Sequence, residues 1–426
     1  MTQSILRRTA QGSRAVTPPP KFRLIAACAL LASTVAVPRY LLAQDAQPAV
    51  SAATVTSSAD TPAAATQTTD TPAAGMPAAA PGSPAAPILG STKLADFLAT
   101  TGITATGYVS ASYYYSSDDS TYHEFDTAHD TVQIDQAAIT VAYQPKEGFG
   151  ALVNLMAGED ARFTNEQENG HDGLFNITQA YLQYASGPLT LIGGRFLSLA
   201  GAESENPTLD TNFSRGLVYY SEPITHTGFR ATYAVTDAIS VIAGVNEGWN
   251  TSSNAYGSKT GELALLYTPN KTFSITGEAY VGKDPDYDAT RALLDVIATY
   301  NATSSLTFIL NYCWGQQQLR PELGTALPSR DWDGLAGFVN YAFNSRWRIS
   351  LRGEFLDDQG GFVTGTPEKI EEGTVTAGYS PVKSFELRLE ARYDTSNEAT
   401  FEYETPDTDT FDAHQTGFAV QGIYKF

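Results

Sequence analysis

From about residue 102 to the C-terminus, apolar and polar residues alternate along the chain. In the segment 385–393, FELRLEARY, every second residue is apolar and the residues between are Glu or Arg. The segment 346–355, RWRISLRGEF, shows the same separation. Successive side chains of a β-strand point to opposite faces, so these segments predict strands with one apolar face and one charged face.

A second pattern groups the predicted strands into pairs. A tyrosine precedes each short turn and another stands near the C-terminus, at Tyr143, Tyr184, Tyr233, Tyr267, Tyr300, Tyr341, Tyr379 and Tyr424. We interpret each tyrosine as the end of one hairpin, formed by an up-strand, a long loop, a down-strand and a short turn. Eight hairpins predict sixteen strands. An even number of strands with alternating short and long connections is typical of bacterial outer-membrane barrels.

The fold class that we predict is all-β, an antiparallel transmembrane β-barrel of about 16 strands with short periplasmic turns and long external loops. The expected strands lie near 102–115, 131–143, 150–159, 174–184, 189–196, 226–235, 239–249, 260–268, 272–282, 291–300, 305–315, 332–342, 346–356, 372–380, 384–394 and 414–425.

The alternative is an antiparallel sandwich in water, whose apolar face would be turned into a core. Three features favour the barrel: Tyr and Trp gather near strand ends on the apolar face, charges lie in the middle of strands on the other face, and long and short connections alternate. A closed barrel also pairs every backbone amide with a neighbouring strand, which hydrocarbon requires.

The residues before the barrel have a different composition. Basic residues, an apolar run over 24–37 and small residues around Ala43 predict a signal peptide over 1–43. An acylated Cys28 and a twin-arginine signal at Arg7 and Arg8 match their patterns less well. Residues 44–90 are rich in Ala, Pro and Thr and predict a disordered periplasmic linker, with a cell-wall tether as the alternative. A lead-in segment over 91–101 then precedes the barrel, which spans 102–426.

Composition excludes some classes of protein. Of 426 residues, 42% are apolar and 17% are charged, and no apolar stretch near the ~20 residues of a membrane helix occurs after the first forty. This excludes a helical membrane protein. The two cysteines exclude a disulfide framework in the mature chain. The formal net charge is −20, and much of the excess lies in predicted loops, so we expect a preference for cations.

The longest predicted connection, residues 197–225, is the candidate pore constriction. It carries Glu203, Glu205, Asp210 and Arg215, yet it also contains the apolar run LVYY at 217–220. We therefore expect it to fold inward, with a solvated surface loop or an extra hairpin as the alternative.

In a ring of sixteen strands, the strand opposite the fifth is the thirteenth. Strand parity there and in the fifteenth places four arginines on the inward face, namely Arg348, Arg352, Arg388 and Arg392. An acidic loop facing these arginines would set a transverse field across the pore. The alternative is that Glu354, Glu386 and Glu390 pair with the arginines and merely satisfy a polar interior.

Enzymatic chemistry finds little support. The five histidines form no pair with metal-ligand spacing, and no Gly-x-Ser-x-Gly motif or phosphate-binding glycine loop occurs. We expect no enzyme activity, no cofactor, no metal and no nucleic-acid partner. The rival to a channel is a structural or adhesive outer-membrane barrel without transport activity.

The chain ends on GFAVQGIYKF, a strand that places Tyr424 on its apolar face. Together with Phe426, it resembles the C-terminal signal that the barrel assembly machinery recognises in outer-membrane barrels.

The middle of the chain contains several short motifs, namely Gly194-Arg195-Phe196, Asn212-Phe213-Ser214-Arg215, Pro223, His226-Thr227-Gly228 and Gly248-Trp249-Asn250. They resemble the beta-barrel porin family of the OmpL-like kind, from the outer membranes of Gram-negative bacteria. The resemblance implies a pore in the cell outer membrane for small hydrophilic solutes or ions, surrounded by lipid and lipopolysaccharide. It implies no particular solute. General trimeric porins offer a looser analogy, which leaves a homotrimer or a monomer open.

Overall fold

The computed structural model describes residues 97–98, 100–118, 121–126, 130–169, 173–252, 257–284, 289–319, 329–405 and 408–426. The predicted signal peptide, the predicted linker and most of the lead-in segment lie outside the described residues.

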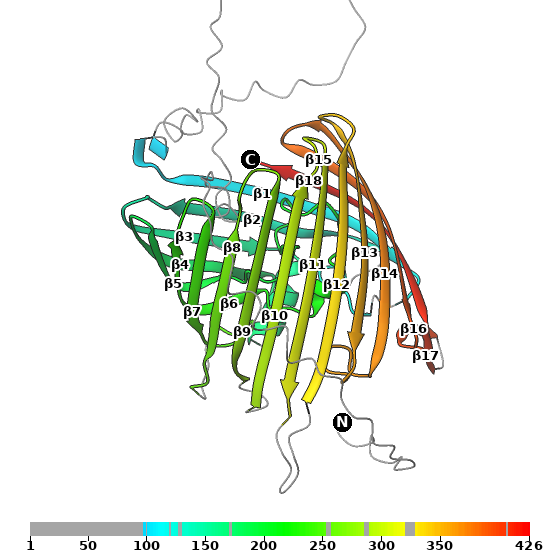
Figure 1. Cartoon of the computed structure of the whole chain (residues 1–426). Helices are drawn as coiled ribbons and strands as arrows, with labels where there is room; N and C mark the ends of the chain where they lie inside the picture. Colours follow the sequence, from blue (N-terminus) through cyan, green and yellow to red (C-terminus); the bar gives the residue numbers. More distant parts are fainter. Residues whose placement is uncertain are drawn as a thin grey trace, which may run out of the picture. The chain divides into compact units, whose positions relative to one another are not determined.

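Sixteen strands of the described chain form one closed antiparallel barrel, with each strand beside its neighbour in sequence (Figure 1). They are β1 (Thr104–Ser116), β2 (Thr131–Tyr143), β3 (Gly148–Ala157), β4 (Phe175–Ser186), β5 (Leu189–Leu197), β6 (Thr225–Ala234), β7 (Ile239–Asn246), β8 (Thr260–Tyr267), β9 (Phe273–Asp284), β10 (Ala289–Asn301), β11 (Leu306–Gln318), β12 (Ser329–Ala342), β13 (Trp347–Asp358), β14 (Glu368–Val382), β15 (Phe385–Ser396) and β18 (His414–Lys425). The predicted fold class is confirmed.

The sequence pattern missed four elements that lie in the long connections. These are α2 (Asp160–Asn169), α3 (Leu217–Tyr220) and a separate hairpin of β16 (Phe401–Thr405) and β17 (Thr408–Asp412). The hairpin had a signal, because FEYET alternates, but its acidic residues favoured the interpretation as a loop. Among the described residues, no helix has the length and apolar character needed to cross a membrane.

The two faces of the wall differ as the alternation predicts. In β15, Leu389 is 52% exposed, whereas the neighbouring Arg388 is 1% exposed. The tyrosines that precede the short turns lie on the outward face, where Tyr143, Tyr300 and Tyr424 are among the exposed aromatic residues. Such a ring of tyrosines suits the boundary between hydrocarbon and water.

The barrel closes between β1 and β18. Tyr108 pairs with Lys425, and the ladder continues to Ser116 opposite Gly417. Beyond it, Gly107 and Phe426 exchange two backbone hydrogen bonds, each 2.9 Å long. A Cβ at Gly107 would lie only 2.6 Å from the Phe426 ring and 2.7 Å from the Ala138 carbonyl oxygen, so the terminal aromatic ring packs onto bare backbone.

We expect the substitution Gly107→Leu to destabilise the barrel by about 1–3 kcal/mol, because the added atoms force backbone and ring apart at the closing seam. The measurement is the temperature at which the barrel loses its compact mobility on an SDS gel. Gly277→Leu is the control, since a Cβ at Gly277 meets nothing within 4 Å. Equal melting temperatures for the two variants would contradict the role of this contact.

Candidate pore constriction

The connection from β5 to β6, residues 198–224, lies against the inward faces of strands across the barrel. Arg352 of β13 donates to the Ser214 carbonyl oxygen at 2.7 Å. The Asn212 amide donates to Thr376 Oγ1 of β14 at 2.7 Å. Tyr280 of β9, which is buried, donates to or accepts from the Ser198 hydroxyl at 3.2 Å. These partners are spread over the inner wall, so the connection crosses the inside of the barrel.

Apolar side chains hold the middle of this connection. Leu217 and Val218 of α3 are buried in one cluster with inward-facing residues of β10 to β14, including Leu293, Cys313, Trp332, Leu356 and Ile370. Burying a side chain of this size contributes about 1.5–3 kcal/mol. The run LVYY, which is too apolar for a loop in water, therefore packs on an apolar patch of an otherwise polar inner wall.

The Glu354 carboxylate of β13 lies at the start of α3. It accepts hydrogen bonds from the backbone N–H groups of Leu217 and Val218, the second at 3.3 Å. A carboxylate is favourable at a helix N-terminus because the first N–H groups have no partner within the helix. A Cβ at Gly216 would overlap the carboxylate, so only glycine allows this approach.

Arg388 of β15 binds the backbone of the connection rather than its acidic side chains. Its guanidinium donates to the carbonyl oxygens of Pro207 at 2.8 Å, Asp210 at 2.7 Å and Asn212 at 2.9 Å. Three carbonyl groups from six residues of chain thus converge on one buried cation. This geometry fixes the path of residues 207–212.

Two further arginines continue the contact. Arg352 forms an ion pair with Glu203 at 2.7 Å and another with Glu372 of β14 at 3.1 Å. Arg392 of β15 donates to the Arg215 carbonyl oxygen at 2.7 Å and pairs with Asp394 at 2.8 Å. Both arginines are nearly inaccessible to solvent.

Arg348 of β13 lies at the edge of this contact. It donates to the Thr211 carbonyl oxygen at 2.6 Å and pairs with Glu386 of β15. Its side chain is 20% exposed, against at most 1% for those of Arg352, Arg388 and Arg392. Of the four wall arginines, it is therefore the one that solvent reaches best.

The acidic residues of the connection differ from one another in their partners. Glu203 pairs with the wall at Arg352, whereas Asp210 pairs at 3.1 Å with Arg215 of the same connection. The Glu205 carbonyl oxygen accepts from Arg215 and from Gln136 of β2, each at 2.9 Å. Burial raises the pKa of Asp210 to about 7 although Arg215 opposes this. Asp210 and other carboxylates hold the pKa of Arg215 above its usual range although burial acts to lower it.

The structure therefore brings the predicted acidic loop and the predicted basic wall into direct contact, with no gap between Glu203 and Arg352. The sequence reasoning expected the two to face each other across the pore. The reason for the difference is physical: charges excluded from water need partners, and the carbonyl groups of residues 203–215 supply them at short range.

Sequence reasoning named Glu222 as an acidic residue of the connection but overlooked the inward-facing carboxylates of the strands beside it. Glu222 lies near Asp295 of β10 and Glu278 of β9, and burial together with the Asp295 charge raises the pKa of Glu222 well above its usual value. Glu262 of β8 belongs to the same region and pairs with Arg230 of β6 at 2.8 Å. Strand parity alone could have placed Asp295, Glu278 and Glu262 inward. Among the described residues, no group of three or more His, Cys, Asp or Glu has a geometry that could hold a metal ion.

The connection after β1 also reaches the inner wall, through His123. Its Nδ1 lies 2.7 Å from an Asp126 carboxylate oxygen and its Nε2 lies 3.3 Å from Asp394 of β15. Phe125 packs with Tyr219 of the β5–β6 connection. Because Asp394 also pairs with Arg392, one carboxylate joins both connections to the wall.

We expect Arg388→Ala to release residues 207–212 from the wall, because three carbonyl groups lose a buried partner at a cost of about 3–5 kcal/mol. Amide hydrogen exchange in residues 207–214 should become about 100-fold faster or more. Arg348→Ala is the matched control, since Arg348 contacts one carbonyl group of the connection and is more exposed. Unchanged exchange in the Arg388 variant would contradict the anchoring role.

We also expect the β1–β2 connection to loosen as pH rises. Burial and Arg392 oppose the charge of His123, but Asp126 and Asp394 outweigh them and raise its pKa above the usual 6.5. The charged form is thus favoured in the folded state, so its contribution is complete below pH 6.5 and is lost as pH rises through the raised pKa.

The measurement is hydrogen exchange of residues 121–126 between pH 6 and pH 9, corrected for the intrinsic rate. Exchange in the native protein should show a titration step that His123→Gln lacks. A step that persists in the variant would assign the transition to another group.

A protein family and several solved structures are similar to this chain. The family model described as "Putative beta-barrel porin-2, OmpL-like" matches residues 102–426. No curated protein matches the chain. Solved structures with a similar fold include the outer membrane channel DcaP of Acinetobacter baumannii, with a TM-score of 0.52, 11% identity, and coverage of 76% of this chain and 97% of that one.

Two other similar structures have the same TM-score of 0.52, 12% identity, and coverage of 76% of this chain and 99% of theirs. They are the trimer form of the outer membrane protein OmpT of Vibrio cholerae and an anion-selective porin from Comamonas acidovorans. At this identity the likeness concerns the fold. The family match covers more than half of the chain, and this protein therefore belongs to the OmpL-like beta-barrel porin-2 family.

Proposed function

We propose that the protein is an outer-membrane channel for passive diffusion of small hydrophilic solutes or ions, and that the connection within residues 197–225 forms its constriction. The family and the closed barrel favour a porin channel over an enzyme and support an outer-membrane location. The observation that carries the constriction proposal is the contact of residues 198–224 with inward faces of β9, β13, β14 and β15. A segment inside the lumen narrows it, whatever solute passes.

Within the connection, the groups that anchor it are mostly backbone carbonyl oxygens and buried side chains, whereas a solute can reach its half-exposed side chains. Residues 212–219 are all buried, residues 202–208 alternate between buried and half-exposed positions, and Leu209 is 40% exposed. We assign the narrow point to residues 202–211. On this assignment the arginines of the wall act mainly as anchors, and the size and charge of the accessible loop residues decide what passes.

A preference for cations is the second part of the proposal. It is supported by the formal net charge of −20, while Arg352 pairs with Glu203 and Glu372 and Arg392 pairs with Asp394. A positive solute would therefore meet less repulsion than a negative one. The similar fold of an anion-selective porin indicates that this fold is compatible with the opposite preference.

A structural or adhesive barrel is the alternative. It is favoured by the extent of packing inside the barrel, where α3 contacts the wall and Tyr219 contacts Phe125 of another connection. The trimer form of OmpT supports a homotrimer as one assembly of this chain, with a monomer as the other. The proposal also includes export by the predicted signal peptide, assembly through Tyr424 and Phe426, and contact with lipopolysaccharide.

We expect the purified protein to give a steady ion conductance in a planar bilayer. Leu209→Arg should lower the permeability ratio of K⁺ to Cl⁻ by about 5-fold, because a charge close to passing ions is worth roughly 1 kcal/mol near a wet surface. The measurement is the reversal potential in a KCl gradient.

Leu209→Gln is the control for size, and it should leave the ratio near that of the native protein. A folded barrel without conductance would favour the structural alternative. Conductance with an unchanged ratio in Leu209→Arg would place the narrow point elsewhere.

A further inference from the structure

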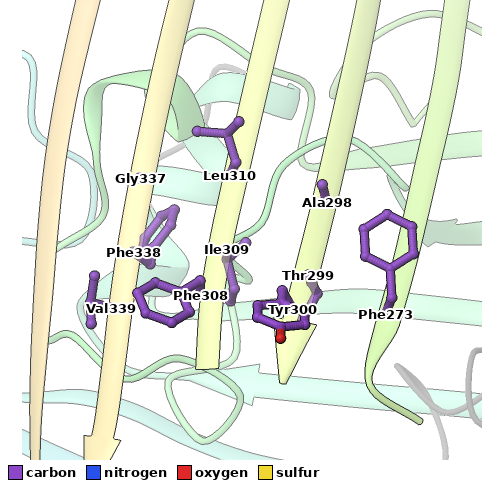
Figure 2. Close-up of a pocket in the computed structure, with 10 residues that line it drawn as sticks. All are labelled: Phe273, Ala298, Thr299, Tyr300, Phe308, Ile309, Leu310, Gly337, Phe338 and Val339. Carbon is purple, nitrogen blue, oxygen red and sulfur yellow. The ribbon is translucent and has the colours of Figure 1, made fainter. Parts of the chain in front are cut away.

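A groove of about 450 Å³ lies on the outward face of β9 to β12, close to the short turns (Figure 2). Ala298 and Gly337 form its floor, and the larger residues around them are Phe273, Tyr300, Phe308 and Leu310. Strand parity places all of these residues on the hydrocarbon side of the wall. The groove is therefore open to the membrane.

The floor of the groove is low because of two small residues in one row of the sheet. Ala298 and Gly337 both stand opposite Leu310 in the ladders of β11. One row nearer the turns, Tyr300 stands opposite Phe308, and their rings stack at 6.4 Å. The row of glycines continues from Gly337 to Gly353 and Gly373 on the next two strands. A slender apolar chain fits a depression of this shape better than a bulky one.

The three turns below the groove differ in charge from the rest of the chain. They span residues 268–272, 302–305 and 343–346, and they contain no acidic residue in a protein of net charge −20. Lys271 lies in the first turn and Arg346 in the third, and both are exposed. The Asn301 amide donates to the Lys271 carbonyl oxygen at 3.1 Å, which places this turn beside Tyr300. The turn between them offers the hydroxyl groups of Thr303 and Ser304.

We propose that this surface binds an anionic phospholipid of the periplasmic leaflet, with one acyl chain in the groove and its anionic headgroup against the turns that carry Lys271 and Arg346. Apolar methylene groups fill the floor over Ala298 and Gly337. Lys271 and Arg346 stand at the starts of β9 and β13, four strand spacings or roughly 19 Å apart, so they attract the headgroup from either side of the groove. A second copy meeting this face through the same face would bring Lys271 of one copy near Arg346 of the other, which like-charge repulsion opposes. The inference does not depend on the channel activity proposed above.

The test uses the full chain in detergent, with phosphatidylglycerol or phosphatidylcholine of identical acyl chains, and native mass spectrometry to measure lipid retention. We expect the native protein to retain phosphatidylglycerol more tightly, by about 5-fold for each basic residue. Lys271→Gln with Arg346→Gln should abolish the preference. Lys146→Gln with Lys383→Gln, which neutralises basic residues in other turns, should keep it.

Gly337→Leu tests the groove itself. It fills the floor without a clash, since the atom nearest to a Cβ at Gly337 is the Gly353 carbonyl oxygen at 3.9 Å. Retention of both lipids should fall about 10-fold, whereas Gly277→Leu, on the same outward face but outside the groove, should leave it unchanged. Compact mobility on an SDS gel confirms that each variant is folded.

Equal retention of the two lipids by the native protein, or undiminished retention by Gly337→Leu, would overturn the proposal. So would a change of oligomeric state in Gly337→Leu without a change in lipid retention, because the occupant would then be a second copy of the chain. Loss of conductance in any variant has no bearing on this result, so failure of the channel proposal is distinguishable.

Discussion

The structure depends on one constraint, that no backbone amide of the wall can remain without a partner in hydrocarbon. Each strand meets this by pairing with two neighbours, and the first strand meets it by pairing with the last. Once the sheet is closed it has only two faces, and the alternation of the sequence assigns a face to each side chain. Apolar residues then lie toward lipid, and Arg, Glu, Asp and Gln lie toward the interior.

Closing the barrel also places charged side chains in its interior. Charged groups such as Arg388 and Arg392 are turned away from lipid, and the space that they enter is largely filled by protein. A cation excluded from water needs partners at short range. For Arg388 the partners are mainly backbone carbonyl groups of the β5–β6 connection, whereas Arg392 is held mainly by the Asp394 carboxylate and by one carbonyl group of the connection. The polar interior and the inward path of the connection thus stabilise each other.

This arrangement changes how the charge of the interior relates to selectivity. Arg352 and Arg392 each pair with a buried carboxylate, so a count of inward-facing arginines overstates the positive charge of the interior. Under the proposed function, the accessible positions of the connection, around Leu209, decide which ions pass.

The sequence by itself determined the number of strands, their approximate bounds and the apolar and polar faces of the wall. These follow from local rules, a period of two and the residues that form turns. The apolar run LVYY led to the proposal that the β5–β6 connection folds inward, whereas the contact of the β1–β2 connection with the inner wall had no such signal. Tertiary structure decided the partners. That Glu203 contacts Arg352, that Arg388 binds three carbonyl groups, and that Glu222 lies near Asp295 depend on the path of a loop across some eight strands, and no local pattern encodes it. The groove over Ala298 and Gly337 likewise depends on the register between strands, because the two small residues share one row only when the ladders align both of them with Leu310.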